Sequence, residues 1–136
     1  MKLFITHTFK GDQNRSEIEQ LCSVVRSAGW EDYCFVRDAE NYSKDVFSNP
    51  KELMLAAKEA IKSCDALLMD ITDPSLGKGI EAGIAFDLAK KIIVIKKKSA
   101  EVRRTAYGIA DLVVEYQKIE DIISPLNNYL LSIKHK

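Results

Sequence analysis

The sequence is poor in the residue types that build disulfide frameworks, metal sites and low-complexity chains. It has three cysteines, two histidines, three prolines and six glycines among 136 residues, and it contains no CxxC pair. The absence of zinc-type Cys/His spacing leads us to expect no metal. The shortage of proline and glycine excludes collagen-like and low-complexity chains. Because the cysteines are odd in number and far apart, we expect free, buried thiols.

Long apolar runs and an excess of one sign of charge are also missing. Unbroken apolar runs such as Ile92–Ile95 are only a few residues long, whereas a membrane-spanning helix needs about 18 or more. Basic and acidic residues number 20 each, so there is no global basic field for nucleic acid. The opening MKLFITHTFKGD turns polar too early for a secretory signal. We therefore expect a cytoplasmic protein with neither a membrane nor a nucleic acid as its partner.

Strand-like runs alternate with helical patterns from end to end. The composition, 46% hydrophobic and 29% charged, is typical of one globular domain, here spanning 1–136. Strands are expected at 2–6, 33–36, 66–71, 92–95 and 112–116, and helices at 16–28, from 50, at 79–89 and from 124. This alternation predicts an α/β fold, a doubly wound (flavodoxin/Rossmann-like) three-layer sandwich with a five-stranded parallel sheet.

Ligands of such folds bind beyond the carboxyl ends of the strands, which directs attention to the segment after the third strand. Gly77 and Gly79 allow close backbone approach to a ligand. The unpaired N–H groups of a helix start attract anions, and Ser75 adds a hydroxyl. Glu81 is expected in the first helical turn, where the positive helix end keeps a carboxylate ionised. An ionised, positioned carboxylate is what a glycosidic nucleophile requires.

Two other interpretations of this segment remain open. Glu81 also fits an ordinary acid at a helix start. Gly77-Lys-Gly79-Ile-Glu-Ala82 loosely fits a dinucleotide-binding fingerprint. That fingerprint, however, belongs after the first strand, and Lys96 stands where an acid would hold the ribose. The run Lys96–Lys98 is expected to be a solvated loop.

The segment Thr72-Asp-Pro-Ser-Leu-Gly-Lys-Gly-Ile-Glu-Ala-Gly-Ile-Ala85 resembles the signature of the nucleoside 2-deoxyribosyltransferase superfamily. It is most similar to the branch of 2′-deoxynucleoside 5′-phosphate N-hydrolases. Phe9-Lys-Gly11 is similar to that branch's glycine-bearing phosphate loop, and Gly108-Ile-Ala-Asp111 to its Gly-Ala-Ala-Asp segment. The resemblance therefore extends over most of the chain.

The resemblance implies roles for several residues. Glu81 matches the family nucleophile, which attacks the anomeric carbon of the deoxyribose. Ser75 matches a hydroxyl that contacts a 5′-phosphate, and Lys10 stands where the branch has a phosphate-loop arginine. The substrate-binding residues expected in all are Phe4, Lys10, Gly11, Ser75, Gly77, Gly79, Arg103 and Arg104.

The resemblance also implies a reaction and an assembly. We expect cleavage of the N-glycosidic bond of a (deoxy)nucleoside or its 5′-monophosphate, with transfer of the deoxyribosyl group to another base or to water. The reaction needs no cofactor. Family members are commonly homodimers or higher homo-oligomers, and Arg103 and Arg104 lie where the hydrolase branch lends a polar residue to its neighbour.

The chain departs from the family pattern at two positions. Ala57 stands where the family usually has an Asp in the second helix, and Phe4 where it often has a Tyr. Both losses leave open a catalytically inactive nucleotide-binding relative. A further alternative is a TIR-like domain that cleaves NAD or mediates assembly, because Phe4-Ile-Thr-His-Thr-Phe-Lys-Gly-Asp12 resembles the opening of such domains.

Overall fold

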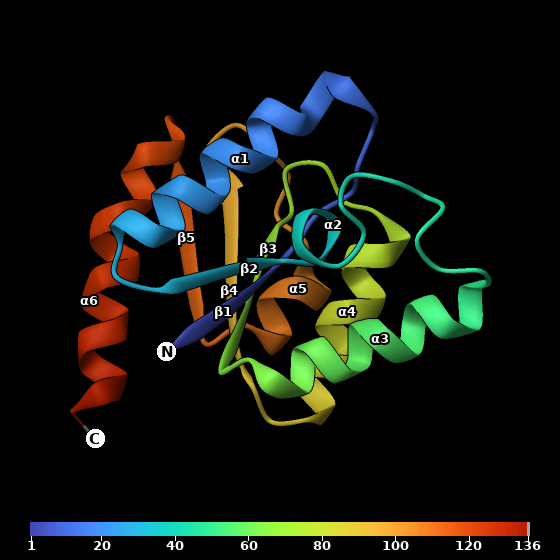
Figure 1. Cartoon of the computed structure of the whole chain (residues 1–136). Helices are drawn as coiled ribbons and strands as arrows, with labels where there is room; N and C mark the ends of the chain where they lie inside the picture. The colour runs from blue at the N-terminus through green and yellow to red at the C-terminus, as the bar shows by residue number, and fades with distance from the viewer. Residues whose placement is uncertain (136) are drawn as a thin grey trace.

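Five short strands form one all-parallel sheet in the computed structural model, which describes residues 1–135 (Figure 1). The strand order is β2-β1-β3-β4-β5, a doubly wound, flavodoxin-like order. The strands are β1 (Lys2–Thr6), β2 (Glu31–Cys34), β3 (Ala66–Asp70), β4 (Lys91–Lys97) and β5 (Leu112–Tyr116). The predicted fold class is confirmed.

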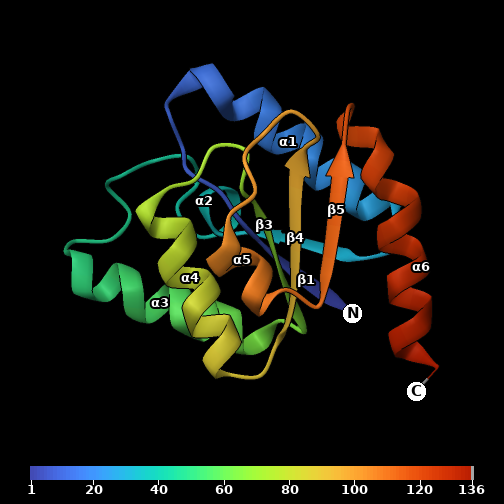
Figure 2. The same cartoon turned by 180° about the vertical axis from the view of Figure 1, so that it is seen from behind.

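Helices cover both faces of the sheet, as Figures 1 and 2 show from opposite sides. The helices on one face are α1 (Asp12–Ser27) and α6 (Ile123–Lys134), with the 3₁₀ turn η1 (Ile119–Ile122). Those on the other face are α3 (Pro50–Ser63), α4 (Leu76–Asp87) and α5 (Arg104–Ile109), together with the short α2 (Phe35–Asp38).

Alternation along the central strands divides the core into two layers. In β4, Ile93 and Ile95 pack toward α1 and α6, while Ile92 and Val94 pack toward α3, α4 and α5. Because successive side chains of a strand point to opposite faces, a strand covered on both sides must be apolar throughout. This is why the run Ile92–Ile95 shows no polar alternation.

Three helices begin at residues other than those expected. Helix α1 begins at Asp12 rather than Ser16. Helix α4 begins at Leu76 rather than Gly79, because Ser75 is its N-cap. Helix α6 begins at Ile123 rather than at residue 124, since η1 leads directly into it.

Two regions near the strand ends also differ from expectation. Strand β2 ends at Cys34, because the backbone N–H of Cys34 donates to Asp38 and the chain turns at once into α2. The expected solvated loop at Lys96 is wrong, since Lys96 belongs to β4 and is 2% exposed. Its ammonium donates to three backbone carbonyls, those of Lys97, Lys98 and Ala100.

The cysteines are in the expected state. Cys22, Cys34 and Cys64 are free and buried. Across residues 1–135, every helix is too short or too polar to cross a bilayer.

Candidate active site

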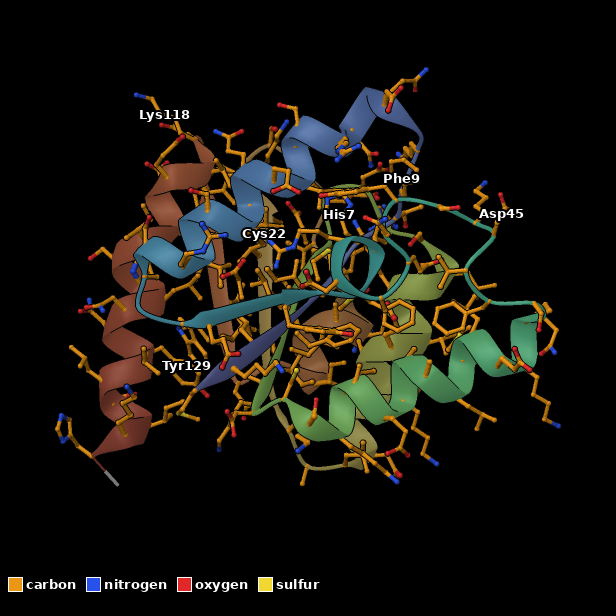
Figure 3. The ribbon with its side chains drawn as sticks, viewed as in Figure 1. His7, Phe9, Cys22, Asp45, Lys118 and Tyr129 are labelled. Atoms are coloured by element: carbon orange, nitrogen blue, oxygen red, sulfur yellow. The ribbon has the colours of Figure 1, made fainter. Side chains whose placement is uncertain are left out.

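A cavity of about 450 Å³ opens at the carboxyl edge of the sheet. It lies where the connection after β1 leaves toward one face of the sheet and the connection after β3 leaves toward the other, which is where doubly wound folds bind ligands. Figure 3 shows His7 and Phe9 on the segment after β1, beside α2 and its following loop. The walls come from the segment after β1, from α2 and its loop, from α3 and from the start of α4.

Glu81 is the best-defined acidic group of this cavity. Thr6, the last residue of β1, donates a hydrogen bond of 2.6 Å from Oγ1 to Oε1 of Glu81. Burial is the main cause that raises the pKa of Glu81 to about 7; the hydrogen bond from Thr6 acts against it and the nearby carboxylate of Glu40 acts with it. One oxygen is thus held in place at the base of the cavity, on a carboxyl group that titrates near neutrality.

The helix dipole does not set the charge of Glu81, contrary to the sequence-based expectation. Since α4 begins at Leu76, Glu81 lies in the second turn rather than the first. The favourable effect of a helix N-terminus on a carboxylate fades within the first turn. Desolvation therefore dominates and moves the pKa upward instead of keeping it low.

Ser75 links the connection after β3 to the connection after β1 through hydrogen bonds of its side chain. Its Oγ accepts from the backbone N–H of Lys78 at 3.3 Å, which makes Ser75 the cap of α4. The same oxygen lies 2.8 Å from Oγ1 of Thr8, in the segment after β1. Ser75 and Gly77 both line the cavity, so the hydroxyl and the start of α4 form part of its wall. Gly79 does not line this cavity and faces the groove between α4 and α5.

Lys78 holds the loop between β3 and α4. Its ammonium donates to the carbonyl oxygens of Asp70 at 3.0 Å and Asp73 at 2.8 Å. The side chain is 5% exposed, and burial lowers its pKa. Nothing in the sequence indicated this role, because a lysine between two glycines is typical of a solvated surface charge.

Lys10 lies outside the cavity. It forms an exposed ion pair with Asp73 and lines a smaller neighbouring hollow. Gly11 precedes α1 with a φ of 74° and does not line the cavity either. Asn14 holds the segment between β1 and α1 in place. Its side chain accepts a hydrogen bond from the backbone N–H of Lys10 and donates one to the carbonyl of Thr8.

Three other expected binding residues are also away from the cavity. Phe4 is fully buried in β1 and packs against Tyr33 and Phe35. Arg103 is exposed beside α5 and pairs with Glu101 at 3.2 Å. Arg104, the first residue of α5, is exposed. A single chain therefore does not bring Phe4, Arg103 or Arg104 to Glu81.

Sequence reasoning missed two charged residues that line the cavity, Glu40 and Lys44. Both lie in the polar stretch after α2. A charged residue in such a stretch is typical of a solvated loop, so it gives no sign of a binding role. Phe9 and Phe35 supply aromatic rings to the wall, and Phe35 stacks on Phe47 with centroids 5.8 Å apart. Figure 3 labels Asp45 in this loop, next to Lys44 in the chain.

Ala57 is the departure from the family pattern that reaches the cavity. It lies in α3, is 1% exposed and lines the wall. The carboxylate expected from the family at this position is therefore absent from the cavity wall itself. Among residues 1–135 there is also no group of three or more His, Cys, Asp or Glu side chains placed to hold a metal ion.

The fold and the cavity define a flavodoxin-like α/β domain with a carboxyl-bearing pocket at its switch point. No family model matches the chain, and no curated protein matches its sequence. Solved structures do match it. The CMP N-glycosidase BcmB of Clostridium botulinum is 25% identical, with a TM-score of 0.65, over 94% of this chain and 100% of that one.

Two further structures share the fold at lower identity. A conserved protein of Enterococcus faecalis V583 is 13% identical, with a TM-score of 0.77, over 95% of this chain and 98% of the other. A 2-deoxyribosyltransferase of Bacillus psychrosaccharolyticus is 15% identical, with a TM-score of 0.68, over 90% of each chain. The matches to the glycosidase and the transferase support the nucleoside 2-deoxyribosyltransferase superfamily, at weak sequence identity.

Proposed function

We propose that the protein cleaves the N-glycosidic bond of a 2′-deoxynucleoside 5′-monophosphate, with Glu81 as the nucleophile and water or a second base as the acceptor. The observation that carries this proposal is the contact between Thr6 and Glu81 at the base of the cavity. General glycosyl cleavage or transfer is also supported by the similar structures, which are named as an N-glycosidase and a deoxyribosyltransferase.

Glu81 acts as a carboxylate on the anomeric carbon. Displacement at this carbon passes through an oxocarbenium-like transition state, which a negative oxygen below the ring stabilises and can capture as a glycosyl ester. The hydrogen bond from Thr6 occupies Oε1 and leaves Oε2 to attack. Water or a base then opens the ester and returns the carboxylate.

The aromatic and aliphatic wall is suited to the nucleobase. Phe9 and Phe35 present rings, and Leu53 and Met54 of α3 add apolar surface. Stacking on an aromatic ring stabilises a base by about 1–3 kcal/mol. The base therefore lies between the segment after β1 and α3, with the sugar toward Glu81.

The 5′-phosphate is assigned to the start of α4. Ser75 offers a hydroxyl, Gly77 a backbone N–H without an intrahelical partner, and Lys44 a cation from across the cavity. Lys10, expected from the sequence to help here, is engaged with Asp73 outside the cavity. Lys44 takes that role in this proposal.

A homodimer completes the pocket in this proposal. Leu76 lines the cavity and is 82% exposed, and Ile80 and Phe86 of the same helix are also exposed. A second chain on this helix would cover these apolar side chains and shield the sugar from bulk water. It would also bring the neighbour's Arg103 and Arg104, exposed beside α4 and α5, toward the pocket.

Substrate screening with purified protein tests the function. Deoxynucleosides, ribonucleosides, their 5′-monophosphates and NAD are incubated with and without an acceptor base, and released bases are measured by chromatography. We expect base release from deoxynucleoside monophosphates. NAD cleavage alone would instead identify a TIR-like enzyme, and tight binding of a nucleotide without turnover would identify an inactive relative.

Glu81→Gln is the decisive variant. Loss of the nucleophile should lower kcat by at least about 1,000-fold, because an amide cannot form the ester. The matched control is Glu59→Gln, which makes the same change at an exposed residue of α3 that pairs with Lys62. Near-normal turnover of a folded Glu81→Gln protein would remove Glu81 from this role.

A further inference from the structure

We propose that Glu40 is the second catalytic carboxyl of this site, the general acid that protonates the departing base. This inference rests on the proposed function. The family's second carboxylate is missing, because Ala57 stands at its position. Breaking an N-glycosidic bond, however, leaves negative charge on the base unless a proton is supplied. Glu40 lines the same cavity wall as Ala57 and Glu81.

Backbone hydrogen bonds to residues before and after Glu40 hold it in this position. Its backbone N–H donates to the carbonyl of Phe35 at 3.0 Å, and its carbonyl accepts from Ser43 N–H at 2.9 Å. Asn41 and Tyr42 follow with φ values of 49° and 55°, conformations that cost a residue with a Cβ about 1 kcal/mol or more. Tyr42 N–H donates to the carbonyl of Val36, which fixes this turn.

Packing of Tyr42 further anchors the turn that carries Glu40. Its ring lies against Phe9, with centroids 5.4 Å apart, and under the guanidinium of Arg15. Its hydroxyl donates to Glu19 of α1. The segment after α2 is thus tied to the segment after β1 and to α1, so that Glu40 is positioned by tertiary contacts rather than left on a free loop.

The surroundings of Glu40 suit a proton donor. In the part of the chain that the structure describes, its carboxyl forms no hydrogen bond or ion pair, and burial raises its pKa. The titratable side chains that share its cavity are His7 from the segment after β1, Lys44 from its own loop and Glu81 from α4. Helix α3 contributes only apolar side chains. Two carboxyls in one cavity disfavour double ionisation, so the pair retains one proton to a higher pH than a lone carboxyl does, and in this proposal that proton reaches the base through Glu40.

The reaction then balances without any further reagent. The O–H of Glu40 transfers its proton to a ring nitrogen or carbonyl oxygen of the base as the bond from that base to the anomeric carbon breaks. An oxygen of Glu81 bonds to the same carbon. In the second half, the Glu40 carboxylate takes a proton from the attacking water, whose oxygen replaces Glu81 on the carbon.

The test compares two substrates that differ in how much their base needs a proton. One is a deoxynucleoside 5′-monophosphate that the wild type cleaves. The other is its derivative with a better leaving group, N7-methylated for a purine or 5-fluorinated for a pyrimidine. For Glu40→Gln we expect kcat to fall at least about 100-fold on the first substrate, within the usual range for a general acid, and less than about 10-fold on the second.

The pH profile and a conservative variant give independent readouts. Glu40→Gln should lose the high-pH decline of kcat, because no acid remains to deprotonate, and Glu40→Asp should retain part of the activity. Glu59→Gln serves as the control and should match the wild type on both substrates. Equal losses on both substrates with Glu40→Gln, or a loss below about threefold, would overturn the role. A wild type that cleaves neither substrate, or an active Glu81→Gln, would instead overturn the proposed function and this role with it.

Discussion

The hydroxyl of Thr6 donates to Oε1 of Glu81 across 75 residues of sequence, at 2.6 Å. Thr6 ends β1 and is 2% exposed, so the bond is shielded from water. A hydrogen bond donated to a carboxylate favours its charged form. Thr6 therefore partly offsets the desolvation that raises the pKa of Glu81 to about 7, and it fixes which oxygen is free.

The pH dependence of the reaction should reflect this balance. A nucleophilic Glu81 must be ionised, and with a pKa of about 7 the rate should fall about tenfold for each unit of pH below that value. Thr6→Val removes the hydroxyl at nearly constant volume, so the pKa should rise further and the acidic limb should move to higher pH. Measurement of kcat/KM from pH 5 to 9 checks both expectations. An unchanged limb in Thr6→Val would show that the hydroxyl does not act on Glu81.

Fold stability should change with pH in the opposite sense. The pKa of Glu81 is raised from 4.5 in an unperturbed chain to about 7 in the folded protein, so the folded state retains a proton that the unfolded state releases. The contribution of this group is therefore greatest below about pH 4.5 and is lost as the pH rises through about 7. Glu81→Gln removes the buried charge and should stabilise the protein by roughly 1–3 kcal/mol at pH 8.

Urea unfolding of both proteins at pH 4.5 and pH 8 measures this effect. The advantage of Glu81→Gln over the wild type should appear at pH 8 and shrink toward zero at pH 4.5. A stability difference independent of pH would show that Glu81 titrates normally in the folded protein.

Two lysines compete for the role of phosphate ligand, and their variants should separate them. Lys44 lines the cavity, whereas Lys10 is outside it and paired with Asp73. For a deoxynucleoside monophosphate, Lys44→Gln should raise KM about tenfold, equivalent to about 1.4 kcal/mol. For the unphosphorylated nucleoside it should have little effect. Lys10→Gln, as the matched control, should leave both KM values near those of the wild type, and the reverse result would return the role to Lys10.

Mixing two inactive proteins tests whether neighbouring chains share a site. Glu81→Ala lacks the nucleophile, and the double variant Arg103→Ala, Arg104→Ala lacks the arginines offered to the neighbour. After subunit exchange, half of the dimers are mixed, and each mixed dimer holds one site with Glu81 from one chain and arginines from the other. About a quarter of the wild-type activity should then return.

The measurement needs proof that exchange has occurred, for example by mass spectrometry of dimers with differently tagged chains. No recovery after proven exchange, or a monomer at working concentration, would contradict the shared site.

Patterns of neighbouring residues in the sequence were sufficient to predict most of the helices and strands. The helix expected from residue 50 begins there in the structure, where Asn49 Oδ1 accepts from Glu52 N–H at 2.9 Å. The strands expected at 66–71 and 92–95 are present as β3 and β4. Such features depend on neighbours a few residues away, which is why they can be read without tertiary structure.

Helix starts were less predictable, because several adjacent residues can cap a helix. Ser75 and Gly79 both suit the start of α4, and the choice of Ser75 moved Glu81 from the first turn to the second. This shift of one turn reversed the expected direction of its pKa, since burial replaced the helix end as the dominant influence.

By itself, the sequence determined the α/β framework and a segment, Thr72–Ala85, that carries Ser75 and Glu81 at a ligand-binding edge. Only the tertiary structure decided which charges meet there. It placed Glu40 and Lys44 in the cavity with Glu81 and left Lys10 outside. The physical reason is that the solvation and Coulomb energy of an ionisable group depend on atoms brought near it by folding, and for Glu81 these include Thr6 of β1 and Glu40 in the loop after α2.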